Sequence, residues 1–369
     1  MKSARHLWPE LVSWPNMLLA LQRCRRRKRY SAAAAEFDYD SMNNLLHLQR
    51  ELVGDYWQPG PYHHFRITDP KPRKISAAPF RDRIVHHAIV NVLEPVFEPR
   101  FIFDSYACRR GKGTHKAIQR AQQYMRRHSW SLKTDIVKFF PSIDHEMLLQ
   151  RIGRTVQDSQ VLKLAATVID SGRGVFADEY VPVFFPGDDL FSLLRPQGLP
   201  IGNLTSQFFA NVYLDSLDHY IREELRVPGY VRYADDLVLF GNSKKEMWDY
   251  RDSIAQFAVS LRLRLHASKT HVAPCTQPIN FLGLRISRDE LRLRSSGVRR
   301  FTRRIRGLQS QLHTGRLSYS DVQASLKAWL AHCGHANTQG LIRDLLKRLR
   351  FRRQPSRRNA PTSPAREPA

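Results

Sequence analysis

An adjacent pair of aspartates, Asp235 and Asp236, interrupts an otherwise apolar stretch of the chain. Residues 230–240 read Tyr-Val-Arg-Tyr-Ala-Asp-Asp-Leu-Val-Leu-Phe, which predicts two short strands joined by a turn that carries the carboxylates. Two carboxylates at close range repel each other by about 1 kcal/mol or more. The pattern therefore indicates a cation at the turn, and Mg²⁺ suits it because Mg²⁺ shares one or two carboxylates with substrate phosphates. A solvated turn with two idle acids is the alternative.

A second β-rich run, residues 130–140, contains Asp135 as its only acid. A lone aspartate at this place is also consistent with a cap on the following helix. Phosphoryl chemistry with two metal ions, however, needs carboxylates from separate strands that meet where the ions sit roughly 3.5–4 Å apart. Asp135 and Asp235 satisfy that requirement if their strands are neighbours.

Three further motifs follow in order along the chain. The first, residues 197–202, is the loop Gln-Gly-Leu-Pro-Ile-Gly, and an apolar helical run comes directly after it. Glycine in such a loop allows the backbone to approach a base or a phosphate closely, although an ordinary loop at a helix start has the same pattern. The other two are Ala-Ser-Lys-Thr at 267–270 and Asn-Phe-Leu-Gly-Leu at 280–284.

Together, from about Tyr62 to Ile286, these motifs resemble the reverse transcriptases. The resemblance implies an α+β fold shaped as a right hand, with fingers, a palm β-sheet backed by helices, and a helical thumb. It implies an RNA-directed DNA polymerase, a nucleotidyltransferase whose partners are template RNA, primer, cDNA and dNTPs. The implied domains are an N-terminal helical extension of the fingers (1–60), fingers (61–130), palm (131–290, with 145–195 partly fingers or insertion), basic thumb (295–352) and disordered tail (353–369).

The resemblance also assigns roles to residues of the site. Two Mg²⁺ ions would be held by Asp135, Asp235 and Asp236 with the Ile136 carbonyl, and Lys269 would protonate the leaving pyrophosphate. Phe140 matches an aromatic beneath the sugar that excludes a 2′-hydroxyl, whereas its neighbour Phe139 is expected in the core. The residues implied in dNTP binding are Lys71, Arg73, Lys74, Phe140, Ile201, Gly202 and Gln207. The residues that match the primer grip are Phe281, Leu282 and Gly283.

One departure from the reverse transcriptase pattern indicates a particular group within that family. The family's palm loop reads Gln-Gly, three residues, then Ser-Pro, but this chain has Ile201 and Gln207 at the first and last of these positions. That form resembles the reverse transcriptases of diversity-generating retroelements, which copy a template RNA with errors at adenines. Ile in place of Gln loses a hydrogen bond worth about 1 kcal/mol, which favours lower fidelity. The resemblance implies a small, basic accessory protein that forms a ring.

Two other functions stay open at this point. One is a retron-like or group II intron-like reverse transcriptase of ordinary fidelity, and the other is a non-catalytic RNA-binding protein. The net charge of +25 and the pI of about 10.4 indicate a polyanionic partner, nucleic acid rather than a membrane surface. No apolar run approaches the ~18–20 residues of a transmembrane helix. Four cysteines far apart in the sequence favour a reducing cytoplasm.

Helices are predicted at both ends of the chain. Residues 41–53 have the leucine spacing of a helix, and Asn16 is a candidate N-cap for an earlier one. Residues 172–194 are rich in Gly, Pro and acids, which predicts a loop or hairpin insertion. Residues 295–369 contain 16 Lys and Arg against 3 acids. Amphipathic helices are expected there at 298–312, 320–331 and 341–351, as suits a thumb that follows a duplex backbone.

Overall fold

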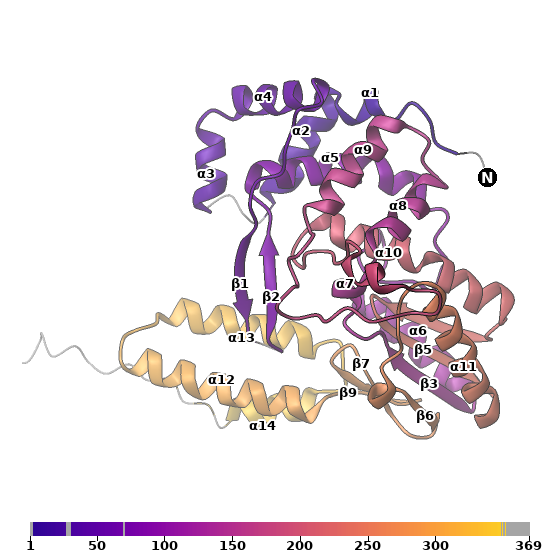
Figure 1. Ribbon diagram of the computed structural model, residues 1–369. Coiled ribbons are helices and arrows are strands. Elements are labelled where there is room, and N and C mark those ends of the chain that lie inside the picture. The colour runs from indigo at the N-terminus through magenta and orange to yellow at the C-terminus, as the bar shows by residue number, and fades with distance from the viewer. Residues whose placement is uncertain (1–2, 27–30, 69–70, 348, 350, 352–369) are drawn as a thin grey trace, which may run out of the picture. The chain divides into compact units, whose positions relative to one another are not determined.

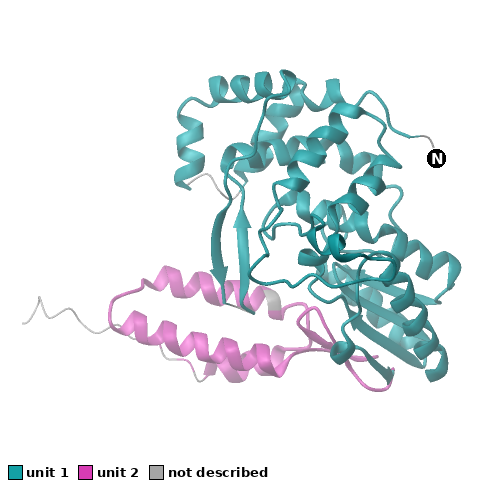
Figure 2. Cartoon of the chain, viewed as in Figure 1, with its two compact units in different colours: residues 1–274 teal, residues 275–369 magenta. Residues whose placement is uncertain are grey.

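The computed structural model describes residues 3–26, 31–68, 71–347, 349 and 351 (Figure 1). The chain forms two compact units, residues 1–274 and residues 275–369 (Figure 2). Both combine helices with antiparallel sheets, which confirms the α+β expectation. The division into fingers, palm and thumb, with its boundaries, stays a prediction. In the part of the chain that is described, no helix has both the length and the hydropathy needed to cross a bilayer.

The N-terminal unit is built around a four-stranded antiparallel sheet of order β4-β5-β3-β6. Residues 237–240 of β5 are fully buried, because helices α6 and α11 pack on the sheet. The strands of this sheet are β3 (Trp130–Asp135), β4 (Gly229–Tyr233), β5 (Asp236–Gly241) and β6 (His271–Pro274), and the two helices on it are α6 (Thr114–Arg127) and α11 (Lys244–Ser260). The two strands predicted around Asp235 are therefore confirmed, and so is the strand that ends at Asp135.

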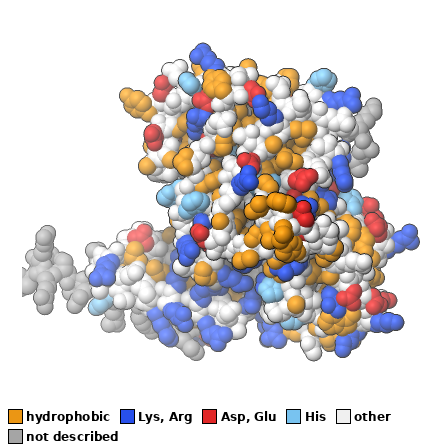
Figure 3. Space-filling view, in the orientation of Figure 1, with side chains coloured by type: hydrophobic (Ala, Val, Ile, Leu, Met, Phe, Trp, Pro, Cys, Tyr) orange, Lys and Arg blue, Asp and Glu red, His pale blue; other side chains and the backbone are white. Residues whose placement is uncertain are grey.

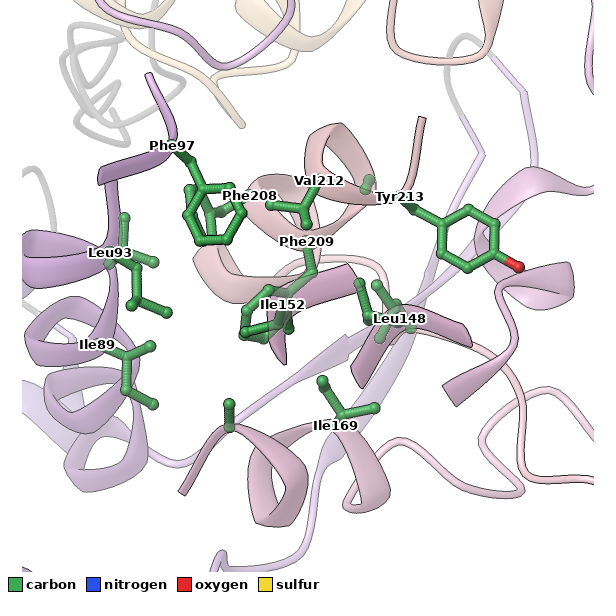
Figure 4. Close-up of a cluster of buried hydrophobic side chains, with 14 of the residues drawn as sticks. Ile89, Leu93, Phe97, Leu148, Ile152, Ile169, Phe208, Phe209, Val212 and Tyr213 are labelled. Atoms are coloured by element: carbon green, nitrogen blue, oxygen red, sulfur yellow. The ribbon is translucent and has the colours of Figure 1, made fainter. Parts of the chain in front are cut away.

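A helical core lies beside this sheet (Figure 4). It is formed by α5 (Phe80–Phe97), α8 (His145–Gly153), α9 (Ser159–Asp170) and α10 (Leu204–His219). Helix α10 is buried over most of its length, as expected of a helix surrounded by protein. Its Phe208 and Phe209 are buried with Phe97 of α5 and Ile152 of α8. The predicted apolar helix after the glycine loop is thus confirmed.

The first four helices of the chain pack on α5 or on one another. They are α1 (Trp8–Leu11), α2 (Trp14–Arg25), α3 (Ala32–Tyr39) and α4 (Ser41–Val53), and the last confirms the helix predicted at 41–53. The N-cap prediction for Asn16 is wrong. Ser13 is the cap, because its Oγ accepts from the Asn16 N–H at 3.3 Å. Asn16 instead donates to the Leu11 and Ala88 carbonyls, which joins α2 to α5.

Two elements of the unit border the sheet end where the aspartates lie. One is the hairpin of β1 (His63–Ile67) and β2 (Arg73–Ala77), and the other is the single-turn helix α7 (Phe139–Ser142). The predicted insertion at 172–194 is a loop that ends in the 3-10 helix η1 (Leu190–Leu194), and no hairpin forms within it. The remaining short elements are the π-helix η2 (Tyr220–Glu224) and the 3-10 helix η3 (Ala267–Lys269).

The C-terminal unit joins a small antiparallel sheet to three helices. The sheet consists of β7 (Ile279–Phe281), β8 (Leu284–Ile286) and β9 (Leu291–Leu293), and the helices are α12 (Ser295–His313), α13 (Tyr319–Cys333) and α14 (Gln339–Lys347). Phe301 of α12 stacks on Trp329 of α13 at 3.9 Å. Arginines occupy the exposed side of α12, and basic side chains are frequent over these helices in Figure 3. The three predicted helices are confirmed as far as Lys347, and the predicted tail lies outside the described residues.

Candidate active site

The sheet brings the three aspartates to one end of its central strands. Strand β3 is the direct neighbour of β5, and their register places Asp135 opposite Asp236. Asp235 lies in the β4–β5 turn, and its carbonyl accepts from the Ile136 N–H at 3.3 Å. The sequence-based expectation that Asp135 and Asp235 meet from separate strands is therefore confirmed.

The turn before the aspartates has a strained backbone, and a buried ion pair supports it. Ala234 has φ +54°, a left-handed conformation that costs a residue with a Cβ roughly 1–2 kcal/mol. Arg232 donates to the Ala234 carbonyl at 3.2 Å and forms an ion pair with Asp218 of α10 at 2.6 Å. Both side chains of the pair are fully buried. Tyr230 adds its hydroxyl, which donates to Asp218 at 2.8 Å.

This network has no motif in the sequence. The available signal was an arginine within an apolar, β-rich run, and in β4 Arg232 is fully buried together with Tyr230 and Val231. An arginine at such a position requires a buried acid. The partner, Asp218, lies on a different element and has no local signature.

The carboxylates of the site repel one another. Burial, and then the charges of Asp135 and Asp236, raise the pKa of Asp235 to about 6, while Arg73 opposes the shift. The Lys269 Nζ donates to Asp135 Oδ1 at 2.7 Å, and the Lys133 Nζ lies 3.5 Å from Asp236 Oδ1. Lysine ammonium groups thus provide the positive charge that the acids require in this structure.

A divalent ion would fit here with help from other oxygens. Across the described residues, no group of three His, Cys, Asp or Glu side chains can hold a metal by itself. Mg²⁺ typically binds one or two carboxylates and completes its shell with water and substrate phosphates. Asp135 and Asp235, which the Ile136 N–H joins through the Asp235 carbonyl, suit that pattern.

The raised pKa of Asp235 predicts a specific pH dependence of stability. Its ionised form is disfavoured by folding, so between about pH 4 and pH 6 the folded chain binds the proton more tightly than the unfolded chain. The free energy of unfolding of the metal-free protein should therefore fall as the pH rises through this window. Asp235→Asn should remove that loss, on the order of 1 kcal/mol at pH 7 after allowance for partial exposure.

Urea unfolding of both proteins in EDTA, from pH 4 to pH 7, measures this effect. Burial and Asp218 also raise the pKa of Asp215 to about 6, but that contribution is common to both proteins. The difference between them isolates Asp235. Parallel curves would show that Asp235 has an ordinary pKa.

The predicted glycine loop is tied to the β1–β2 hairpin. The Ile201 carbonyl accepts from the Ser76 N–H at 2.9 Å, and Asn203 accepts from the Ala78 N–H at 3.1 Å. Gly202 has φ +119°, and a Cβ there would lie 2.8 Å from Ile75 Cγ2. Glycine is therefore required at 202 by both conformation and space. Gln207 is exposed, and Cys108 Sγ lies 3.4 Å from its Oε1.

The two phenylalanines after β3 differ in burial, as expected. Phe139 is 2% exposed and belongs to the core, which confirms that part of the prediction. Phe140 is half-buried against it, with ring centroids 5.5 Å apart. The Phe140 carbonyl accepts from the Leu199 N–H at 2.9 Å, so Phe140 is joined to the glycine loop. Its contact with a sugar stays a prediction.

Basic side chains line a cleft next to the hairpin. Of the predicted dNTP ligands, Lys71 and Arg73 are exposed, whereas Lys74 is half-buried. The cleft has a volume of about 370 Å³. Its lining residues are Arg66, Pro72, Arg73, Lys74, Lys138, Pro141 and Glu179. Arg66 and Lys138 were not found from the sequence, since each lies outside the motif that the resemblance supplied.

The predicted primer grip forms a tight turn in the C-terminal unit. Phe281 ends β7 and pairs with Leu284 of β8. Leu282 and Gly283 have φ +48° and +86°, as in the two-residue hairpins that need positive φ at both central positions. Leucine is unusual at such a position, and the strain is typical of functional turns.

Comparison with known proteins agrees with this geometry. Residues 67–286 match the family described as reverse transcriptase (RNA-dependent DNA polymerase). Protein YkfC of Escherichia coli is 24% identical over 288 residues, which are 66% of this chain and 71% of YkfC. The group II intron-encoded protein LtrA of Lactococcus lactis subsp. cremoris is 22% identical, covering 70% of this chain and 51% of LtrA. Nuclear intron maturase 2, mitochondrial, of Arabidopsis thaliana is 25% identical, covering 56% and 34%.

The family match spans more than half of the chain. The chain belongs to the reverse transcriptase family, and it is an RNA-directed DNA polymerase by class. Membership implies an RNA template, a primer and dNTPs as substrates, and members of the family generally use divalent metal ions. The chain spans about half of LtrA and about a third of the maturase.

Proposed function

We propose that the chain copies a template RNA into cDNA with frequent errors at template adenines, as in a diversity-generating retroelement. The observation that carries the polymerase part is the meeting of Asp135, Asp235 and Asp236 at one end of neighbouring strands. The loop form with Ile201 and Gln207 supports the error-prone part. That loop is hydrogen-bonded to the hairpin expected to hold the triphosphate.

In this proposal the chain positions two reactants and neutralises charge. Asp135, Asp235 and the Ile136 carbonyl would hold two Mg²⁺ ions, with Asp236 beside them. When bound, Mg²⁺ lowers the pKa of the attacking hydroxyl and offsets the charge of the phosphates. The primer 3′-hydroxyl would lose its proton to solvent water, and its oxygen would bond to the α-phosphorus as the bond from that phosphorus to pyrophosphate breaks. Pyrophosphate leaves with the electron pair, and Lys269, now paired with Asp135, would give it a proton.

Other residues of the site would select the nucleotide. Lys71, Arg73 and Lys74 would bind the triphosphate, since Arg and Lys form charge-assisted hydrogen bonds to phosphate. Gly202 would allow close approach, with Ile201 and Gln207 beside the incoming nucleotide. Phe140 would pack beneath the sugar and exclude a 2′-hydroxyl. In the C-terminal unit, Phe281, Leu282 and Gly283 would grip the primer.

The proposed layout is that of a right hand. Residues 61–130 and part of 145–195 would form the fingers behind the helical extension 1–60, and residues 131–290 the palm. The basic helices of 295–352 would form the thumb and follow the phosphates of the RNA–DNA duplex, because the arginines of α12 and Arg343 of α14 are exposed. A small basic accessory protein would complete the active complex.

Ile201→Gln should reduce errors at template adenines about fivefold, the effect of one restored hydrogen bond of about 1 kcal/mol. The assay is primer extension by the purified protein on RNA with Mg²⁺ and dNTPs, with and without a co-expressed accessory protein, followed by sequencing of the cDNA. Ile201→Val is the matched control, because valine also cannot form a hydrogen bond. An error spectrum that Ile201→Gln leaves unchanged would contradict this account of fidelity.

The similarity to LtrA, a group II intron-encoded protein, and to an intron maturase favours a second candidate function. A group II intron-like or retron-like reverse transcriptase would use the same aspartates with ordinary fidelity. Faithful cDNA from the wild-type protein in the same assay would favour this candidate. Errors clustered at template adenines would favour the first.

A further inference from the structure

Two adjacent acids, Asp178 and Glu179, lie in the loop between α9 and α10 and have no role in the proposed chemistry. Glu179 Oε1 is 3.9 Å from Arg66 Nη2, and Asp178 Oδ2 is 3.7 Å from Lys74 Nζ. The backbone of the same loop also accepts hydrogen bonds. Lys74 donates to the Val175 carbonyl at 2.9 Å, and Lys138 donates to the Glu179 carbonyl.

These contacts converge on the basic cleft. Arg66 and Lys74 lie directly opposite each other in the β1–β2 ladder, and like charges in that arrangement destabilise a hairpin. Lys138 and Arg73 add further positive charge to the same cleft, which Glu179 also lines. The two carboxylates therefore supply the counter-charge that the cleft needs when no other anion is present.

We infer that residues 178–179 form an acidic strap that occupies the triphosphate cleft and competes with the incoming nucleotide for Arg66, Lys74 and Lys138. The inference rests on the proposed function of the cleft. A triphosphate presents the same kind of acceptors, negatively charged oxygens, to the same donors. The strap and the triphosphate cannot both hydrogen-bond to these three side chains, so the strap must leave the cleft as the nucleotide binds. The strap thereby weakens nucleotide binding.

The loop that carries the strap is suited to move. The large apolar side chains that follow the strap are mostly in solvent: Val181 is 81% exposed, Phe184 54% and Phe191 78%, whereas Val175 and Phe176, just before the strap, are buried. Hydrophobic side chains gather near the middle of the face in Figure 3. Segments with few buried apolar contacts open locally at small free-energy cost. Polar contacts at 175–179 join this part of the loop to the hairpin, while the buried Val175 and Phe176 hold its start and leave the segment after them free to open.

The test uses inorganic tripolyphosphate as the probe and titration calorimetry with the full-length protein. Asp178→Asn with Glu179→Gln should bind tripolyphosphate about three- to tenfold more tightly than wild type, as expected for the loss of two partly exposed ion pairs. The control, Asp249→Asn with Asp252→Asn, removes two exposed acids from α11 and makes the same change in net charge. Adding Lys138→Gln to the strap variant should reverse most of the gain.

Equal or weaker affinity of the strap variant than of the control would overturn the inference, as would a lack of tripolyphosphate binding by every protein. The probe requires no DNA synthesis, so failure of the polymerase proposal would appear separately. A second readout uses only the wild-type chain. Tripolyphosphate should accelerate chymotrypsin cleavage at Phe184 as the strap leaves, and unchanged cleavage would contradict the inference.

Discussion

Asp235→Asn should lower the rate of DNA synthesis by at least about 10²–10³-fold, the loss typical when a group that stabilises transition-state charge is removed. The same substitution should raise the free energy of unfolding at pH 7. Burial and the charges of Asp135 and Asp236 disfavour the ionised carboxylate, as its pKa of about 6 indicates. Asparagine relieves that repulsion. Opposite changes in activity and stability are typical of a residue retained for catalysis.

Single-turnover primer extension and urea unfolding on the same preparations test both halves of this prediction. Asp252→Asn is the matched control, because Asp252 is an exposed aspartate on α11 and its loss should leave both quantities nearly unchanged. A variant at 235 that is inactive because it is unfolded would show lower stability. A stable variant with wild-type activity would show that Asp235 is not catalytic.

Arg232→Met should cost about 3–5 kcal/mol of stability, because it leaves Asp218 buried without its partner. The substitution also removes the donor to the Ala234 carbonyl. The left-handed turn before Asp235 would then lose its anchor, and activity should fall in the fraction of protein that still folds. Equilibrium unfolding in urea gives the free energy, and primer extension gives the activity.

Two further variants distinguish the loss of stability caused by breaking the buried ion pair from the loss caused by removing any arginine. Arg232→Met with Asp218→Asn should recover much of the stability, since it removes the uncompensated charge, and the coupling follows from the double-mutant cycle. Arg292→Met, in an exposed pair with Glu290, should cost no more than about 1 kcal/mol. A loss at Arg232 as small as that would mean that the buried ion pair does not hold the turn.

The elements that could be predicted from the sequence are those whose pattern lies within a few consecutive residues. The strands around Asp235, the strand that ends at Asp135 and the helix at 41–53 follow from periodicity over a few residues. The order of the motifs then supplied the family, which the comparison confirms. The N-cap was misplaced because Ser13 and Asn16 are both good caps, and only tertiary contacts of Asn16 with α5 decide between them.

The parts of the site that could not be predicted from the sequence depend on contacts between elements far apart in the chain. Arg232 and Asp218 come from a strand and a helix, and Arg66 and Glu179 come from a hairpin and a loop. Neither pair has a spacing rule, because tertiary packing alone brings its members together. The like charges of Arg66 and Lys74 were visible in the sequence, but their direct pairing required the register of the hairpin.

The most direct test of the two-metal site is a count of bound ions. Mn²⁺, in place of Mg²⁺, would be titrated by electron paramagnetic resonance with an RNA template, a primer that lacks its 3′-hydroxyl and the next dNTP. The account predicts two ions on the wild-type protein, with at least one lost in Asp135→Asn and in Asp235→Asn. Two ions retained by both variants would contradict the central claim that these carboxylates assemble the catalytic metals.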